Sequence, residues 1–296
     1  MKSSPRRILY SLPLFIILLL PRPGRAQQDS ATAAIADTAV SGFSISLSYS
    51  SKVLSAGRDY GVRQYGFNPS VIYTHKSGLY AGLHGMWLSE TSPSWAATAL
   101  EAGFGHDIGS SFTYNLAYAH TFFNPDSNGL LSNSLSAALS FSRKWATADL
   151  SYSLLFGEET GHELTAAAGA YFERPTSGWI DLVSSSPSIT AIVGTANLPF
   201  TRLPRSQYVK GTGQTWEQYK ALLAARRAAR RNAASTADNE LHLMGWDIAL
   251  PLAFHCKSFL AELSYHYSIP VRLPDEDAAT IVSQGYWGVS LVYTIK

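Results

Sequence analysis

Apolar and polar residues alternate one by one through most of the chain. In residues 43–50, serine occupies every second position, and the positions between are apolar or aromatic: Phe43, Ile45, Leu47 and Tyr49. A period of two is typical of a β-strand whose two faces meet different surroundings. The same period returns in residues 285–296 and in many segments between, so the pattern predicts an all-β protein.

The alternation predicts twelve strands, most of them 10–13 residues long. They cover 42–54, 66–75, 79–89, 95–107, 111–123, 131–143, 146–156, 163–173, 188–200, 241–255, 259–270 and 285–296. Globular strands usually have about five or six residues, whereas a tilted strand that crosses a bilayer needs about ten. The segment 188–200 is the least regular, because Ile189, Ile192 and Val193 do not share one parity.

The connections between these strands alternate in length. Short links at 76–78, 108–110, 144–145 and 256–258 follow strands 2, 4, 6 and 10, and longer links lie at 55–65, 124–130, 201–240 and 271–284. Outer-membrane barrels show this alternation, with the short turns on the periplasmic side. One link breaks the rule, since residues 174–187 are too long for a tight turn.

The polar positions argue against a secreted β-sandwich or lipocalin-like barrel. Charged residues make up 15% of the chain, whereas soluble proteins carry about 25%. The polar faces hold Ser, Thr, Asn, Gly and Ala rather than the Lys and Glu of a soluble surface. Aromatic residues gather near strand ends, as at a membrane interface. We therefore predict a twelve-stranded antiparallel transmembrane outer-membrane β-barrel with one helical outer loop.

The first residues predict export. Lys2, Arg6 and Arg7 precede an apolar run at 8–20, and the small residues Gly24 and Ala26 come before Gln27. This arrangement is typical of a cleaved signal peptide, here 1–26. Residues 27–41 then form a flexible leader and 42–296 the barrel, in the outer membrane of a Gram-negative bacterium. Cys256, the single cysteine, cannot form an internal disulfide.

Two stretches resemble known outer-membrane proteins. Residues 285–296 alternate apolar and aromatic side chains to the end, as in the C-terminal assembly signal of such proteins, which usually ends in Phe and here ends in Ile295-Lys296. That resemblance implies the outer-membrane assembly machinery as a partner. In a closed barrel this strand pairs with the first and leaves no exposed edge.

A second resemblance covers roughly the first half of the chain. The run S-L-S-Y-S-S-K-V-L-S-A-G-R-D-Y-G, followed by P-S-V-I-Y-T-H-K-S-G-L-Y-A-G, resembles small TorF-like porins. The Ser-x-Tyr strand of those porins corresponds here to the segment with Tyr49. Their Arg-Gly pair corresponds to Gly57-Arg58, in which the two residues have the reverse order. The resemblance implies an outer-membrane pore and no catalytic residues.

The inward parity of the predicted barrel collects ionisable residues. The predicted pore-lining residues are Glu101, Asp149, Glu163, Asp247, Glu262, His84 and His266. A lumen lined with carboxylates favours cations. The alternative is an interior that is simply polar, with these groups solvated or paired.

Residues 201–238 carry eight basic and two acidic residues. Within them, 215–234 predicts a helix, because Ala is abundant and Thr215 can cap its start. One side of this helix collects arginines: Arg226, Arg227, Arg230 and Arg231. The helix is either a solvated loop, or a plug whose arginines meet the acidic lumen, or a site that binds lipopolysaccharide phosphates.

We expect a narrow porin-like channel for passive transport of small solutes, with a preference for cations. The alternative is a non-conducting barrel for surface binding or envelope structure, and the third is a lipid-modifying enzyme. An enzyme is not expected, because spacing alone assigns no nucleophile, base and orienting group. We also expect no cofactor, no metal and no nucleic-acid binding. A serine and a histidine close together at one height of the barrel would favour the enzyme. The expected partners also include membrane lipid and lipopolysaccharide.

Overall fold

The computed structural model describes residues 41–54, 56–58, 64–91, 93–124, 131–157, 160–195, 240–273 and 281–296. The strands are β1 (Gly42–Ser50), β2 (Gly66–Thr74), β3 (Leu79–Leu88), β4 (Trp95–Ile108), β5 (Phe112–Phe123), β6 (Asn133–Arg143), β7 (Ala146–Phe156), β8 (Thr160–Ala170), β9 (Phe172–Pro175), β10 (Leu182–Ser185), β11 (Ser188–Thr195), β12 (Leu241–Cys256), β13 (Phe259–Pro270) and β14 (Gln284–Ile295). The predicted signal peptide, the leader up to residue 40 and the predicted helix 215–234 lie outside the described residues.

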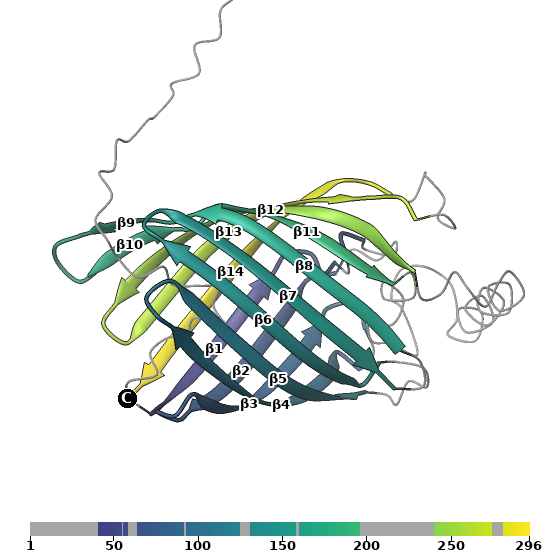
Figure 1. Ribbon diagram of the computed structural model, residues 1–296, viewed down its shortest axis with the longest axis horizontal. Coiled ribbons are helices and arrows are strands. Elements are labelled where there is room, and N and C mark those ends of the chain that lie inside the picture. The colour runs from purple at the N-terminus through teal and green to yellow at the C-terminus, as the bar shows by residue number, and fades with distance from the viewer. Residues whose placement is uncertain are drawn as a thin grey trace, which may run out of the picture.

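Twelve of these strands close into one antiparallel barrel, as predicted (Figure 1). Pairing runs in chain order from β1 to β8, continues through β11, β12 and β13, and returns through β14 to β1. The closing seam joins eight residue pairs, from Phe43 with Ile295 to Ser50 with Gly288. The alternating stretch at 285–296 is therefore a paired strand and not an exposed edge, which confirms the expected closure.

The exterior of the barrel is apolar on every side. Leu83 on β3 opposes Leu100 on β4, and the side chain of Leu100 is 51% exposed. Large exposed apolar residues lie on eleven of the twelve barrel strands, all except β8, among them Ile45, Val71, Leu116, Leu135, Leu150, Ile189, Leu250, Leu263 and Leu291. Water does not tolerate a continuous apolar surface of this extent, whereas a bilayer covers it. The closed ladder also satisfies the backbone groups that lipid cannot.

Between the described strands, short and long connections alternate as expected, except that only three residues, 157–159, link β7 to β8. We call the end with the turns at 75–78, 109–111, 144–145 and 257–258 the short-turn end, and the opposite end the long-loop end. Among the described residues, no helix is long and apolar enough to cross a membrane.

Residues 172–185 explain the one long link at the short-turn end. They form a hairpin of β9 and β10, and β10 pairs with the last turn-side residues of β12, with Leu182 opposite His255. Because β12 has 16 residues and β11 only eight, the hairpin continues the wall where β11 has not yet begun (Figure 1). The predicted strand 163–173 was placed three residues too late, because β8 runs from Thr160 to Ala170.

Pro251 lies in β12 at the gap between its two neighbours. Ala249 pairs with Ser188 of β11, and Ala253 pairs with Ser184 of β10. Pro251 lies between these two pairs and has a partner on neither β10 nor β11. The hydroxyl of Ser185 donates to the carbonyl of Pro251 at 2.6 Å. Proline has no N–H and is accepted in a sheet only where the ladder is interrupted, as it is here.

A β-bulge changes the face that β12 presents. Ile192 pairs with Gly245 and Val193 with Leu243, so Met244 has no partner on β11. Strict alternation from Trp246 would place Met244 on the outer face, but Met244 is 0% exposed and packs inside. A bulge adds one residue and so reverses the parity beyond it.

The irregular parity of the predicted strand 188–200 has a simple cause. β11 pairs without a shift along β8, with Ile189 exposed outside and Ile192 packed against the buried Met244. The strand is regular, and Ile192 is an apolar residue on the inner face.

Candidate functional site

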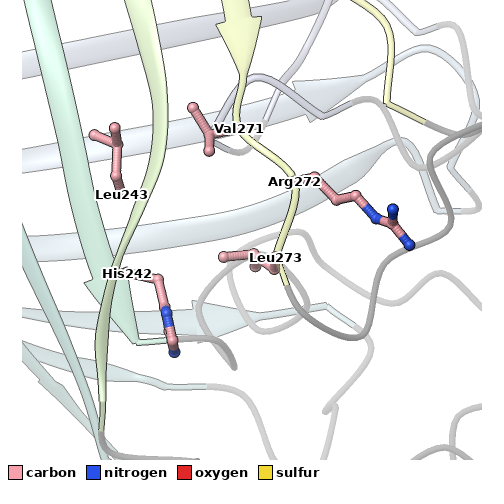
Figure 2. A pocket seen from close by; sticks show the side chains of 5 residues that line it. All are labelled: His242, Leu243, Val271, Arg272 and Leu273. Carbon is pink, nitrogen blue, oxygen red and sulfur yellow. The ribbon is translucent and has the colours of Figure 1, made fainter.

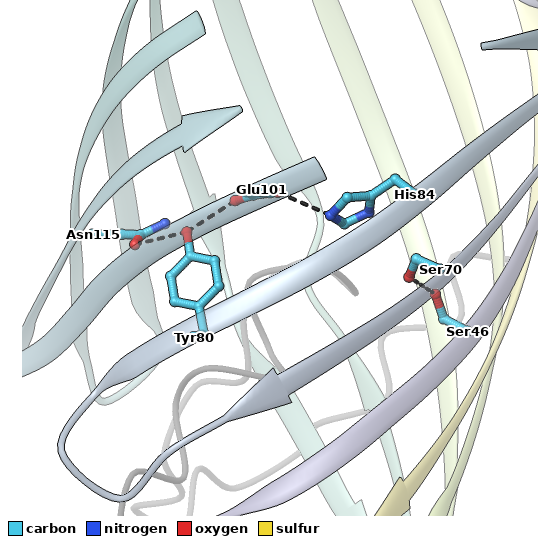
Figure 3. Close-up of polar contacts among 6 residues, drawn as sticks. All are labelled: Ser46, Ser70, Tyr80, His84, Glu101 and Asn115. Atoms are coloured by element: carbon cyan, nitrogen blue, oxygen red, sulfur yellow. Dashed lines mark hydrogen bonds and ion pairs between the residues drawn. The ribbon is translucent and has the colours of Figure 1, made fainter. Parts of the chain in front are cut away.

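The interior wall around the closing seam consists of short hydroxyl side chains. β1 turns four serines inward, and three of them meet hydroxyls of the neighbouring strands. The Oγ atom of Ser46 lies 2.7 Å from that of Ser70 (Figure 3). The Oγ atom of Ser48 lies 3.1 Å from that of Ser290. Such side chains satisfy one another along the wall and take up little of the interior.

A first ionisable cluster lies on β3, β4 and β5. Nε2 of His84 is 2.9 Å from Oε2 of Glu101, and the hydroxyl of Tyr80 donates to Oε1 at 2.9 Å. The same hydroxyl lies 3.1 Å from Oδ1 of Asn115. Figure 3 shows the four side chains pointing toward one another inside the barrel. Gly103 leaves room for this arrangement, because a Cβ there would lie 2.4 Å from the Tyr80 ring.

A second ionisable cluster lies on β12, β13 and β14. Nδ1 of His266 is 3.0 Å from Oδ1 of Asp247, and Nε2 of His266 is 3.2 Å from Oγ of Ser264. The ring of Tyr286 stacks on His266, with centroids 4.7 Å apart and planes at 8°. A serine, a histidine and a carboxylate thus come together at one height of the barrel, which spacing in the sequence did not reveal.

All seven predicted pore-lining residues lie on the interior face. The structure joins His84 to Glu101 and His266 to Asp247. The other three face inward between small neighbours: Asp149 opposite Ala167, Glu163 opposite Ser153, and Glu262 opposite Ser290. Their role in a pore stays a prediction. The predicted site at Arg226, Arg227, Arg230 and Arg231 lies outside the described residues.

An apolar cluster lies inside the long-loop end of the barrel. Its buried members come from four different segments: Leu131, Leu155, Met244 and Leu273. Ala56 of the β1–β2 connection and Ile192 of β11 pack against it. Hydrophobic constrictions narrow membrane pores, so this cluster would narrow an opening at the long-loop end.

Arg58 anchors the β1–β2 connection beside that cluster. Its side chain is 6% exposed and donates to the carbonyl oxygens of Ala56 at 2.7 Å, Met244 at 3.1 Å and Val271 at 2.7 Å. The connection is thereby fixed to β12 and to the end of β13. This contact could not be predicted from the sequence, because Arg58 donates to backbone carbonyl oxygens, which every residue has.

A recess of about 570 Å³ opens next to the same end of the barrel. The β12–β13 ladder stops at Gly245 and Pro270, and one further hydrogen bond joins the Val271 N–H to the Met244 carbonyl. Five residues line the recess: His242, Leu243, Val271, Arg272 and Leu273. Figure 2 shows Arg272 extending away from the other four, so the walls of the recess are mostly apolar.

At the short-turn end, polar contacts tie the β9–β10 hairpin to the barrel. Oγ of Ser184 lies 2.9 Å from Nε2 of His255, and the Tyr171 hydroxyl donates to Glu173 at 3.1 Å. Burial, and then the neighbouring Glu173 carboxylate, raise the pKa of Tyr171 to about 12. Among the described residues, no group of three or more His, Cys, Asp or Glu could hold a metal ion.

The closed antiparallel barrel, its continuous apolar exterior and its hydroxyl-rich interior define a transmembrane β-barrel of the outer-membrane type. No protein-family model and no curated protein matches the sequence.

Three similar solved structures are themselves outer-membrane barrels. The NanC porin is 9% identical, with 85% of this chain and 98% of that chain covered and a TM-score of 0.43. The KdgM porin in complex with disordered oligogalacturonate is 11% identical, over 86% and 99%, with a TM-score of 0.43. LpxR from Salmonella typhimurium is 7% identical, over 84% and 99%, also at 0.43. At these scores the likeness supports no functional assignment, and the TorF-like resemblance stays a prediction.

Proposed function

We propose that the barrel is a narrow porin-like channel for passive diffusion of small solutes, with a preference for cations. The observation that supports it most is the make-up of the interior wall. Serines of β1, β2 and β14 bond one another along the seam, and carboxylates project from the middle of β4 and β12. A wall of short polar side chains suits the passage of hydrated solutes.

The cation preference rests on the signs of the charges that face inward. Each imidazole of the two clusters is paired with one carboxylate, so neither His84 with Glu101 nor His266 with Asp247 can carry a net positive charge. Carboxylates in a low-dielectric wall create a negative potential that concentrates cations.

The test is the conductance of the refolded barrel in a planar lipid bilayer under a tenfold KCl gradient. The expected result is stepwise openings with a reversal potential on the cation-selective side, shifted toward zero in Glu101→Gln and Asp247→Asn. Glu240→Gln removes a charge at an exposed position at the start of β12 and should leave the potential unchanged. Anion selectivity would refute the cation preference. Silence from the wild type and from Arg58→Ala, both shown to be folded by their heat-dependent gel mobility, would refute the channel.

A second candidate is a non-conducting barrel for surface binding or envelope structure. The apolar cluster at the long-loop end favours it, because Met244, Leu273 and the Arg58 contacts narrow that end. If the folded wild-type protein is silent and Arg58→Ala is silent as well, this candidate replaces the channel. Lipopolysaccharide and the assembly machinery stay proposed partners.

A further inference from the structure

Two neighbouring strands bring together a serine, a histidine and a carboxylate in a defined order. Ser264 and His266 lie two residues apart on the inner face of β13, and Asp247 lies on β12 beside them. Nε2 of His266 meets Ser264 at 3.2 Å, and Nδ1 meets Asp247 at 3.0 Å. The nucleophile, base and orienting group of serine hydrolases have this connectivity.

The protonation of the imidazole follows from its partners. A carboxylate only accepts hydrogen bonds, so Nδ1 of His266 carries the proton that it donates to Asp247. In the neutral ring, Nε2 is then the acceptor and takes the hydrogen bond from the Ser264 hydroxyl. This is the tautomer that a general base requires.

Tyr286 holds the imidazole in place. Its ring stacks on His266, with centroids 4.7 Å apart and planes at 8°. In the other cluster, Nε2 of His84 is occupied by Glu101 and meets no serine. Of these two histidines, His266 has the hydrolytic arrangement and His84 forms a plain ion pair.

Ser264 is 8% exposed, and a glycine on one neighbouring strand leaves space beside its hydroxyl. Its partners on the two neighbouring strands are Pro251 and Gly288. A Cβ at Gly288 would lie only 2.6 Å from Oγ of Ser264, so glycine keeps that side of the hydroxyl clear. Because the site faces the polar interior and not the apolar exterior, its substrate is a small water-soluble ester rather than a membrane lipid.

We propose that Ser264, His266 and Asp247 form a hydrolytic site for small carboxylic esters inside the barrel. Oγ of Ser264 attacks the carbonyl carbon while its proton moves to Nε2 of His266. The ester C–O bond breaks, the alcohol leaves with that proton, and the acyl group stays on Ser264. Water then attacks the acyl carbon, His266 takes and returns a proton, and the carboxylic acid leaves. Asp247 is a positioning residue that acts through His266.

Catalysis is tested with the folded full chain in detergent micelles, by release of p-nitrophenol from p-nitrophenyl acetate. Ser264→Ala and His266→Gln should each lower the rate at least about 100-fold, toward the buffer rate. Asp247→Asn should lower kcat and leave KM unchanged. Ser46→Ala removes another interior hydroxyl, one that meets a serine and no imidazole, and should keep the wild-type rate. Equal rates in the wild type and Ser264→Ala would overturn the proposal.

Labelling adds a readout that separates nucleophilicity from folding. A fluorophosphonate probe should phosphonylate Oγ of Ser264 with loss of fluoride, and mass spectrometry should place the adduct on the peptide that contains it. Heat-dependent gel mobility confirms that each variant is folded. An adduct at another residue, or none on the folded wild type, would also overturn the proposal. Detergent assays do not depend on conductance, so the channel and this site can fail separately.

Discussion

Arg58 should control the local stability of the long-loop end. Its guanidinium donates to three carbonyl oxygens, but the Met244 carbonyl also accepts the N–H of Val271 at 2.8 Å and so keeps a partner when Arg58 is lost. The carbonyls of Ala56 and Val271 lose a charged donor. A hydrogen bond to a charged group contributes about 1.5 kcal/mol or more, so Arg58→Ala should destabilise the contact by about 3 kcal/mol.

That loss corresponds to local opening about 100-fold more often, since about 1.4 kcal/mol is a factor of ten. Hydrogen exchange measured by mass spectrometry should show it at the amides of Val53 and Val271, which bond to the carbonyls of Gln64 and Met244. Arg58→Lys should lie between, because an ammonium lacks the planar fork that reaches several carbonyls at once.

Arg174→Ala serves as the control, because Arg174 is exposed on the β9–β10 hairpin at the other end. It should leave exchange at Val53 and Val271 unchanged. Wild-type exchange rates at both amides in Arg58→Ala would show that the carbonyl contacts do not hold this end, and the reasoning would be refuted.

Three further predictions concern core packing, backbone conformation and ionisation. Met244→Ala should lower the free energy of unfolding by about 2–4 kcal/mol in urea titrations, because the side chain is fully buried; a loss below about 1 kcal/mol would contradict the bulge assignment. Gly78→Ala should lower the free energy of unfolding by more than about 3 kcal/mol, because φ is +91° and a Cβ would lie 2.1 Å from the Gly105 carbonyl oxygen. Gly109→Ala, at φ +66° with open space around it, should lower it by about 1–2 kcal/mol. Equal losses would refute the steric reasoning. The pKa of Tyr171 is about 12 in the folded state and near 10 in the unfolded chain. The wild type should therefore lose up to about 2–3 kcal/mol of stability as pH rises between those values, and Tyr171→Phe should lose less. Parallel losses in the two proteins would contradict the raised pKa.

Alternation alone was enough to predict the architecture. The two-residue period located the twelve barrel strands, and the length of the links predicted which ends carry short turns. Met244 shows where this reasoning stops. A bulge is defined by the register against a neighbouring strand, so one chain's pattern cannot show that Met244 turns inward.

The hairpin at 172–185 and the second cluster escaped prediction for a related reason. Four-residue strands are too short to show a period, and the hairpin forms only because β12 extends beyond β11. The inward parity of Asp247 and His266 was predictable, but their contact with each other depends on the stagger between β12 and β13. Stagger is a property of two strands together.

The seam between β1 and β14 joins positions about 250 residues apart in the chain. Bringing such distant segments together costs about 5 kcal/mol of chain entropy before any pair across the seam contributes. β1 pairs with β2 on one side, and its other edge stays open until β14 pairs with it. The slowest and most vulnerable stage of the barrel's biogenesis is therefore expected at its final pairing, and a chaperone that covers the edge of β1 would protect the protein most.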